Sequence, residues 1–321
     1  MIRFRGIIMI AFSFSLMSNA AGQSLSSKQI TLLHGFGAGG NADTMARILG
    51  EAMSRNLGQT IVVEPKPGAS GVIASQILSR APADGHTLLM LTAAHATTAT
   101  LNKNIKYDPV EDFSMLSTVG FFPYILAVNK ANPVQSLTDL IQRSKQFPGS
   151  ISFTSVGLGS VPHLTAELLA NETGIKMIHV PYQGGAAPVL DVLGGRVDIL
   201  VDTPTVTMPH IKEGTLRGIG VTSKKEWPAA PGIPSISGSV PGFEVETWIG
   251  LATVKGTPKE IVDRLQAAAV SSLNLPDVKA KLSELGADVR SSTSNEMTKL
   301  VREEIARWRA VIERAGIKEG Q

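Results

Sequence analysis

The stretch Gly35-Phe36-Gly37-Ala38-Gly39-Gly40 lies between an apolar run at residues 30–33 and a helical pattern at residues 42–57. A second turn of this kind, Ser155-Val156-Gly157-Leu158-Gly159-Ser160, precedes a helical pattern at residues 163–171. A strand that turns tightly into a helix leaves the first helical amides unpaired, and these amides and the helix dipole attract an anion. Glycines let the backbone approach that anion closely. Two such turns, one in each half of the chain, predict that a small anionic ligand is held from two sides.

The composition is that of a globular protein with more than one core. The chain has 321 residues, of which 43% are hydrophobic and 18% charged. Single cores stop growing at roughly 250–300 residues, so this length favours two domains. Lysines and arginines are dispersed, which argues against nucleic acid as a partner. The chain has no cysteine, which excludes disulfides, thiolate metal sites and lipid attachment at an N-terminal cysteine.

The first twenty residues have the pattern of a secretory signal peptide. Arg3 and Arg5 precede an apolar run at residues 7–17, and Ser18-Asn19-Ala20 forms a small-x-small cleavage site. The apolar run is too short to cross a bilayer, which takes about 20 residues. Removal of residues 1–20 lowers the formal charge from +3 to +1, because two arginines and no acids are lost. We therefore expect an exported protein, located in the bacterial periplasm or an equivalent space.

The rest of the chain alternates between apolar runs typical of strands and amphipathic runs typical of helices. This alternation predicts an α/β fold with parallel sheets and helices on both faces. The expected strands are residues 30–33, 61–63, 88–91, 124–128, 151–153, 177–180 and 197–201. The expected helices are residues 42–57, 71–79, 137–144, 163–171, 186–193, 258–269 and 295–315.

The expected organisation is two lobes, with the first lobe discontinuous. Residues 28–122 and 223–321 are assigned to lobe 1 and residues 123–222 to lobe 2. The proline-rich stretch 227–241 is interpreted as a connector that returns the chain to lobe 1. The last helical pattern carries an apolar stripe, which predicts a helix that covers the core of lobe 1.

The first glycine-rich turn permits a second interpretation. Gly35, Gly37 and Gly40 spell G-x-G-x-x-G between a strand and a helix, and Glu64 ends the next strand where a ribose-binding acid would lie. This pattern indicates an exported dinucleotide-binding oxidoreductase as the alternative. Export and the rigid Pro65-Lys66-Pro67-Gly68 turn after Glu64 argue against it.

Few residues suggest catalysis or metal binding. Ser160 lacks a G-x-S-x-G context, and His163 and Glu167, four residues apart on a predicted helix, form only a weak metal pair. Asp43 lies in the first turn of a helix, where it either complements the helix dipole, orders the loop, or meets a hydroxyl or amino group of a ligand. We expect no catalytic residue, no metal and no cofactor.

Two polar residues end predicted strands. Asp202 follows the apolar strand 197–201, and Tyr182 follows the strand 177–180. Ligands of open α/β sheets bind at the carboxyl ends of strands. Each residue is therefore a candidate for the wall of a ligand cleft, although Asp202 could instead cap a turn before Pro204.

The chain resembles the periplasmic solute-binding proteins of tripartite tricarboxylate transporters, the TctC or Bug family. The resemblance rests on many short motifs in one order between residues 29 and 318, and on no single one. They are GGNAD at 39–43, PGASG at 67–71, DGHTLL at 84–89, YDPVEDF at 107–113, HVPYQG at 179–184, LGGRVD at 193–198, VTS at 221–223, WIGL at 248–251, GTP at 256–258 and the region 304–308. Gly35 and Gly37 depart from the family's proline-containing first loop, and a more flexible loop costs more to order on binding.

The resemblance implies a type II periplasmic-binding-protein fold, in which two α/β lobes close on a small carboxylate such as a di- or tricarboxylic acid. It also implies delivery of that ligand to membrane transporter subunits, and we expect a monomer. The implied ligand-binding residues are Phe36, Gly37, Gly39, Gly40, Ser155, Gly157, Gly159, Ser160 and His163, with Thr92, Ala93, Tyr182 and Asp202 as wall contacts. Asp43 is a further candidate because of its place in the first turn of the helix. A sensory role, in which the liganded form contacts a membrane receptor, is not separated from transport by any feature of the sequence.

Overall fold

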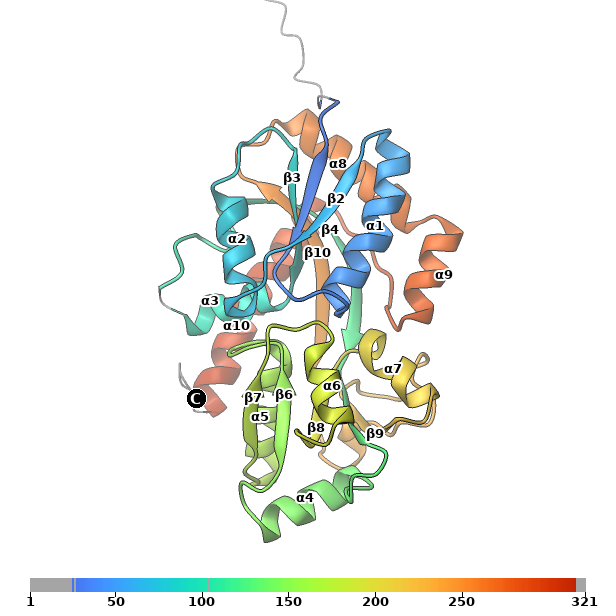
Figure 1. Ribbon diagram of the computed structural model, residues 1–321. Helices are drawn as coiled ribbons and strands as arrows, with labels where there is room; N and C mark the ends of the chain where they lie inside the picture. Colours follow the sequence, from blue (N-terminus) through green and yellow to red (C-terminus); the bar gives the residue numbers. More distant parts are fainter. Residues whose placement is uncertain (1–24, 26, 103, 316–321) are drawn as a thin grey trace, which may run out of the picture.

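The computed structural model describes residues 25, 27–102 and 104–315. The expected signal peptide at residues 1–20 lies outside the described residues. The chain folds into two lobes, each built on a five-stranded sheet with helices packed against it (Figure 1). No helix among the described residues is both long enough and apolar enough to cross a membrane.

The first lobe contains the sheet β2-β1-β3-β10-β4. Its strands are β1 (Ile30–His34), β2 (Ile61–Pro65), β3 (Thr87–Thr92), β4 (Phe113–Pro123) and β10 (Glu246–Val254). The helices of this part of the fold are α1 (Asn41–Leu57), α2 (Val72–Ser79), α3 (Ala94–Leu101), α8 (Lys259–Leu273), α9 (Pro276–Glu284) and α10 (Ser294–Ala315), with a 3-10 turn at Ala69–Gly71. β1, β2 and β3 are parallel, whereas β10 runs antiparallel to β3 and β4.

The second lobe contains the sheet β7-β6-β8-β5-β9. Its strands are β5 (Ile125–Asn129), β6 (Ser152–Ser155), β7 (Ile178–Pro181), β8 (Ile199–Asp202) and β9 (Leu216–Val221). Its helices are α4 (Leu137–Gln146), α5 (Val161–Thr173), α6 (Ala187–Leu193) and α7 (Pro204–Lys212), and a 3-10 turn follows at Ile236–Gly238. β5 is antiparallel to both β8 and β9.

The α/β class and the two-lobed architecture are confirmed, but the expectation of purely parallel sheets is wrong. Each sheet contains a strand that runs against its neighbours, β10 in the first and β5 in the second. β5 is where the chain enters the second lobe, and β10 is where it returns to the first (Figure 1). The apolar pattern of a strand shows that it is buried but carries no information on its direction, which depends on the path of the chain between the lobes.

Local sequence explains why the predicted helices form where they do. Ser136 caps α4, because its side chain accepts a hydrogen bond from the backbone of Asp139. α1 ends at Gly58, whose φ of 65° is in the left-handed region that favours glycine. One face of α1 is buried in the first lobe at helical spacing and includes Met45, Leu49 and Met53.

The proline-rich stretch is more than a connector. Ser235 bridges to Val221 at the end of β9, and Ile233 and Ile236 fill the space above Gly218 and Gly220. The segment therefore packs on the sheet of the second lobe before β10 begins. The exact division of the chain into lobes stays a prediction, since the strands change sheet between residues 123 and 125 and again between 221 and 246.

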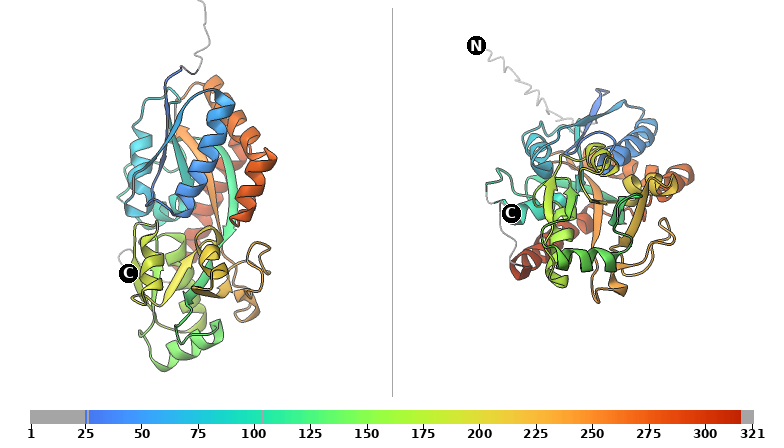
Figure 2. Two further views of the ribbon diagram at one scale, coloured as in Figure 1. Left: turned by 45° about the vertical axis from the view of Figure 1, so that its right-hand side comes forward. Right: turned by 60° about the horizontal axis from the view of Figure 1, so that its bottom comes forward.

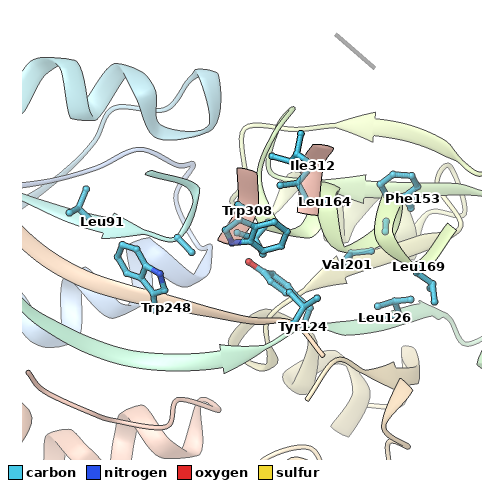
Figure 3. Close-up of a cluster of buried hydrophobic side chains, with 14 of the residues drawn as sticks. Leu91, Tyr124, Leu126, Phe153, Leu164, Leu169, Val201, Trp248, Trp308 and Ile312 are labelled. Carbon is cyan, nitrogen blue, oxygen red and sulfur yellow. The ribbon is translucent and has the colours of Figure 1, made fainter. Parts of the chain in front are cut away.

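The terminal helix α10 packs on both lobes, not only on the first. Met297 lies against Gly250 of β10, while Trp308 and Ile312 belong to the same buried cluster as Leu164 of α5. Figure 3 shows Trp308 between the lobes, beside Leu164 and Ile312. In the right-hand view of Figure 2 the red end of α10 lies beside the green helices of the second lobe. The apolar stripe is confirmed as buried, but it packs on both lobes, whereas the sequence predicted packing on lobe 1 alone.

The two crossing segments are tied together at Thr222. The backbone N–H of Tyr124 donates to the Thr222 hydroxyl at 2.8 Å, and that hydroxyl donates to the carbonyl of Val245 at 2.6 Å. All three residues are buried. This arrangement fixes where the lobes meet, and therefore where a ligand between them would lie.

Candidate functional site

The two lobes touch directly through their loops. The Gly37 N–H donates to the Gln183 carbonyl at 2.8 Å. The Ser70 hydroxyl donates to the Leu158 carbonyl at 2.8 Å, and the Thr97 hydroxyl donates to the Gly159 carbonyl at 2.7 Å. These bonds join residues 62 to 146 positions apart in the chain. The structure is therefore a closed one, in which both glycine-rich turns lie at the junction of the lobes.

A cavity lies between the lobes near the crossing segments, and we call it the hinge cavity. Its water-accessible volume is about 60 Å³. Its lining residues are Phe36, Gly40, Asn41, Ala42, Thr92, Ala94, Tyr124, Val156, Val161, Pro162, Gly184, Gly185, Asp202, Thr203, Thr247 and Ile249. Thr92 ends β3 and Asp202 ends β8, so the cavity lies at the carboxyl ends of strands from both sheets, where α/β proteins bind ligands.

Helix N-termini from both lobes border the hinge cavity. The first intrahelical bond of α1 runs from the Thr44 N–H to the Gly40 carbonyl, so the amides of Asn41 and Ala42 have no partner within the helix. In α5 the first intrahelical bond runs from the Leu164 N–H to the Ser160 carbonyl, so the Val161 amide also has no partner within its helix. None of the residues lining the hinge cavity is lysine or arginine. The helix dipoles and these amides make the cavity favourable to an anion.

A second cavity, the loop cavity, is larger but lies among the loops that join the lobes. Its water-accessible volume is about 330 Å³. Its lining residues are Gly35, Gly68, Ala69, Ser70, Thr98, Leu101, Asn102, Val156, Gly157, Leu158, Gly159, His163, Tyr182 and Gln183. Val156 lines both cavities, so they are neighbours. We take the hinge cavity as the candidate site, because Asn41 and Val161, the first residues of α1 and α5, line it and do not line the loop cavity.

The predicted site residues are divided between the two cavities. Phe36, Gly40, Thr92 and Asp202 line the hinge cavity. Gly157, Gly159, His163 and Tyr182 line the loop cavity. The remaining predicted residues line neither cavity, and they are Gly37, Gly39, Asp43, Ala93, Ser155 and Ser160.

Four amides that were expected to face an anion are already hydrogen-bonded within the protein. Besides the Gly37 amide, the Gly39 N–H donates to the Asp43 carboxylate at 2.9 Å. The Gly157 N–H donates to the Ser155 hydroxyl, and the Gly159 N–H donates to Nδ1 of His163. The glycine-rich turns therefore use these amides to hold their own shape and to join the lobes. The amides open to the hinge cavity are the ones at the start of the helices.

Asp43 orders the first loop. Its carboxylate accepts hydrogen bonds from the Gly39 backbone and from Arg47, and lies 3.1 Å from Nε2 of the buried His34. Burial acts to raise the pKa of Asp43, but the hydrogen bonds from Arg47 and Gly39 hold that pKa below its usual value. The carboxylate is thus charged, and its hydrogen bonds are made to residues of the loop and the helix. Of the three roles that the sequence left open for Asp43, this favours ordering of the loop.

A histidine pair supports the second loop. The rings of His163 and His179 stack with centroids 4.1 Å apart, and Nε2 of His179 lies 2.6 Å from the Ser155 hydroxyl. Burial lowers the pKa of His163 to about 3 and that of His179 to about 4, so both are neutral at physiological pH. Nε2 of His163 lies 3.9 Å from Glu167, and no group of three metal-binding side chains occurs among the described residues.

Tyr182 contributes its ring, not its hydroxyl, to the wall between the lobes. The hydroxyl donates to the carboxylate of Asp191 within the second lobe. The sequence placed Tyr182 correctly at the end of a strand, but the direction of its hydroxyl depends on Asp191, which lies on α6.

Asp202 is the acid of the hinge cavity. It is 7% exposed, and its Oδ1 accepts a hydrogen bond from the Thr203 backbone at 2.7 Å. Burial raises the pKa of Asp202 to about 6, against an ordinary value of 3.8. At neutral pH the carboxylate is charged, and no cation lines the cavity to pair with it.

We expect the buried charge of Asp202 to cost stability at neutral pH. The folded-state pKa is raised, so the folded protein loses stability as the pH rises from 3.8 through 6, and the full cost of about 3 kcal/mol applies above that range. Asp202→Asn should therefore be more stable than the wild type by about 1–3 kcal/mol at pH 7.5. Below pH 4 the difference should disappear. Urea unfolding of both proteins at pH 7.5 and below pH 4 measures this difference in stability. A difference of the same size at the two pH values would contradict the prediction.

Several residues of the hinge cavity were not anticipated from the sequence. Thr247 and Ile249 arrive on β10 from the far end of the chain, and Gly184 and Gly185 follow β7. The strand-end rule could have indicated Thr203 and Gly184, since both follow predicted strands. Nothing in the sequence indicates that β10 passes beside β3, which brings Thr247 into the cavity.

Comparison with protein families gives one match over most of the chain. The model of the TctC family, described as "Tripartite tricarboxylate transporter family receptor", matches residues 45–317. Among curated proteins, a "UPF0065 protein in tcbD-tcbE intergenic region" of Pseudomonas sp. (strain P51) is 34% identical over 288 residues, which cover 89% of this chain and 86% of that protein.

Solved structures with the same fold include periplasmic binding proteins. Rpa4515 of R. palustris with adipate has a TM-score of 0.89 and 34% identity, and the match covers 92% of this chain and 99% of that one. The periplasmic binding protein BugD has a TM-score of 0.88 and 32% identity, covering 91% and 99%. MatC of Rhodopseudomonas palustris with bound malate has a TM-score of 0.85 and 29% identity, covering 89% and 99%.

Proposed function

This chain belongs to the TctC family of tripartite tricarboxylate transporter receptors, which includes the Bug proteins, and we propose that it captures a small carboxylate between its lobes for delivery to a membrane transporter. It is a solute-binding protein of that family. We place it in the periplasm, because the similar protein BugD is described as a periplasmic binding protein. We assign it no enzymatic activity, because its family is one of receptors.

The observation that supports this proposal most is the hinge cavity. Amides of α1 and α5 that have no partner within their helices border it from opposite lobes, and its lining contains no lysine or arginine. A carboxylate there would be held by helix dipoles and hydroxyls, and the threonines that line the cavity are Thr92, Thr203 and Thr247. Such a site distinguishes ligands by size and by polar groups more than by charge alone.

The likeness to ligand-bound relatives supports the same class of ligand. Adipate and malate, which are bound in Rpa4515 and MatC, are both dicarboxylates of four to six carbons. We propose that the ligand of this chain is an organic acid in this size range, with one carboxylate in the hinge cavity toward the N-termini of α1 and α5. The rest of the molecule would extend into the adjoining loop cavity, because about 60 Å³ is too small for the whole ligand.

The contacts of the first loop do not favour a dinucleotide. A Cβ on Gly37 would lie 2.9 Å from the Gly184 carbonyl, so the second lobe already occupies the approach that a pyrophosphate would need. Glu64, the candidate ribose ligand, instead forms an ion pair with Lys66 at 3.1 Å. These contacts support a binding protein over an oxidoreductase.

A thermal-shift screen tests the proposal. At 100 times its Kd, a carboxylate ligand should stabilise the protein by about 2.7 kcal/mol, and calorimetry should then give one site per chain. The panel should contain mono-, di- and tricarboxylates of two to eight carbons, with the corresponding amides and NAD as controls. If no acid raises the melting temperature, or if NAD does so instead, the proposal is wrong.

A further inference from the structure

Asp202 presents an acceptor to the hinge cavity that the protein leaves unused. Its Oδ1 takes the hydrogen bonds of Thr203, whereas Oδ2 receives no hydrogen bond from the described residues. The side chain is more than nine-tenths buried and lines the cavity. Since Asp202 lines the cavity, this oxygen can accept a hydrogen bond from a donor that a molecule in the cavity brings.

A second acceptor in the same cavity is also unused. Oδ1 of Asn41 is buried and has no hydrogen-bond partner among the residues that the structure describes. Asn41 is the first residue of α1 and lines the hinge cavity with Asp202. The residues that line the cavity thus include, in each lobe, a polar side chain with an oxygen that accepts no hydrogen bond from the described residues.

The charge of Asp202 sets a condition on the ligand. A ligand carboxylate is attracted to the helix N-termini but repelled by a second carboxylate in the same low-dielectric cavity. The repulsion is removed if the ligand part facing Asp202 carries a hydrogen-bond donor instead of another acceptor. A purely acidic ligand without such a donor would leave Oδ2 unsatisfied and place like charges together.

We propose that Asp202 selects carboxylates that also carry a hydroxyl or ammonium group, which donates to its free Oδ2. This inference rests on the proposed carboxylate-binding function and specifies the ligand class within it. Hydrogen bonds to a charged acceptor of this kind change affinity by a factor of about 10 to 100. The neighbouring Thr203 hydroxyl, 3.4 Å from Oδ1, leaves Oδ2 open to the ligand.

Matched acids that differ only at the second carbon test the proposal. Succinate, malate and aspartate form one set, glutarate, 2-hydroxyglutarate and glutamate a second, and adipate, 2-hydroxyadipate and 2-aminoadipate a third. Calorimetric titration at pH 7.5 should show that the wild type binds a donor-bearing acid at least about tenfold more tightly than the plain acid of equal length. In Asp202→Asn this ratio should fall to within about threefold, because the charge is gone. Asp263→Asn, which removes an exposed acid on α8, should keep the wild-type ratio.

The outcomes separate this inference from the proposed function. If the wild type binds the plain acids as tightly as their donor-bearing partners, the inference is overturned while carboxylate capture stands. If the preference persists in Asp202→Asn, Asp202 is not its source. If no acid of any set binds, both the inference and the proposed function are wrong. The wild-type ratio alone tests the ligand class, so the result does not depend on how well the variant folds.

Discussion

Gly185→Ala is expected to weaken carboxylate binding by at least about 100-fold while both lobes stay folded. Gly185 lies in the turn after β7, and a Cβ there would stand 2.6 Å from the Ala38 carbonyl oxygen and 3.0 Å from the Gly37 carbonyl carbon. Both are backbone atoms of the other lobe, so they cannot rotate away as a side chain would. Relief requires the lobes to separate at the edge of the hinge cavity, and such a displacement costs the closed state about 1–3 kcal/mol.

The backbone of Gly185 introduces a second cost that a control can remove. Its φ of 77° lies in the left-handed region, where alanine is strained by about 1–2 kcal/mol. Gly214 has a φ of 75° and nothing within 4 Å of its Cβ position, so Gly214→Ala carries the strain without the clash. Calorimetry of both variants with the acid found in the screen measures the difference. Solution scattering should show that Gly185→Ala is more extended than Gly214→Ala. Equal affinities in the two variants would contradict the closed arrangement described here.

Trp308→Ala is expected to lower the free energy of unfolding by about 3–5 kcal/mol. Trp308 is 1% exposed and shares its buried cluster with residues of both lobes, including Tyr124 at the crossing segment and Leu164 on α5. Figure 3 shows its ring among these side chains. Its Nε1–H also donates to the Glu304 carboxylate at 3.0 Å, which would lose this partner. Truncation would leave a large cavity where α10 joins the lobes.

Denaturant unfolding followed by circular dichroism measures this loss. Trp308→Phe keeps an aromatic ring and should lower the free energy of unfolding clearly less than Trp308→Ala. Arg309→Ala, at an exposed position of the same helix, should change the free energy of unfolding by under about 0.5 kcal/mol. A loss below 1 kcal/mol for Trp308→Ala would show that α10 does not hold the two lobes together.

Many elements of the fold could be predicted because their signals are local. The apolar run and glycine-rich turn before α1, the Ser136 cap of α4 and the stripe of α10 each lie within a few turns of chain. Other elements were missed for equally local reasons. α7 contains Pro209 in its interior, where proline usually indicates a helix break, and α3 is too short and too rich in small residues to show a clear apolar face.

The candidate site could be predicted only in part. The strand-end rule indicated Asp202 and the family resemblance indicated Thr92, and both residues line the hinge cavity. The glycine-rich turns lie at the junction of the lobes. The sequence could not predict which amides remain available to a ligand, since the Gly37 N–H donates to the Gln183 carbonyl and the Gly159 N–H donates to Nδ1 of His163. These partners become visible only when distant parts of the chain are brought together.

The sequence by itself determined the α/β class, the family and most helices and strands, because periodicity, caps and short motifs act over a few consecutive residues. The tertiary structure decided the direction of β5 and β10, the two-lobe packing of α10 and the isolation of the Asp202 carboxylate in the hinge cavity. Each of these depends on contacts between residues far apart in the chain. Such contacts follow from how the two lobes close on each other, and no local pattern of residues records that geometry.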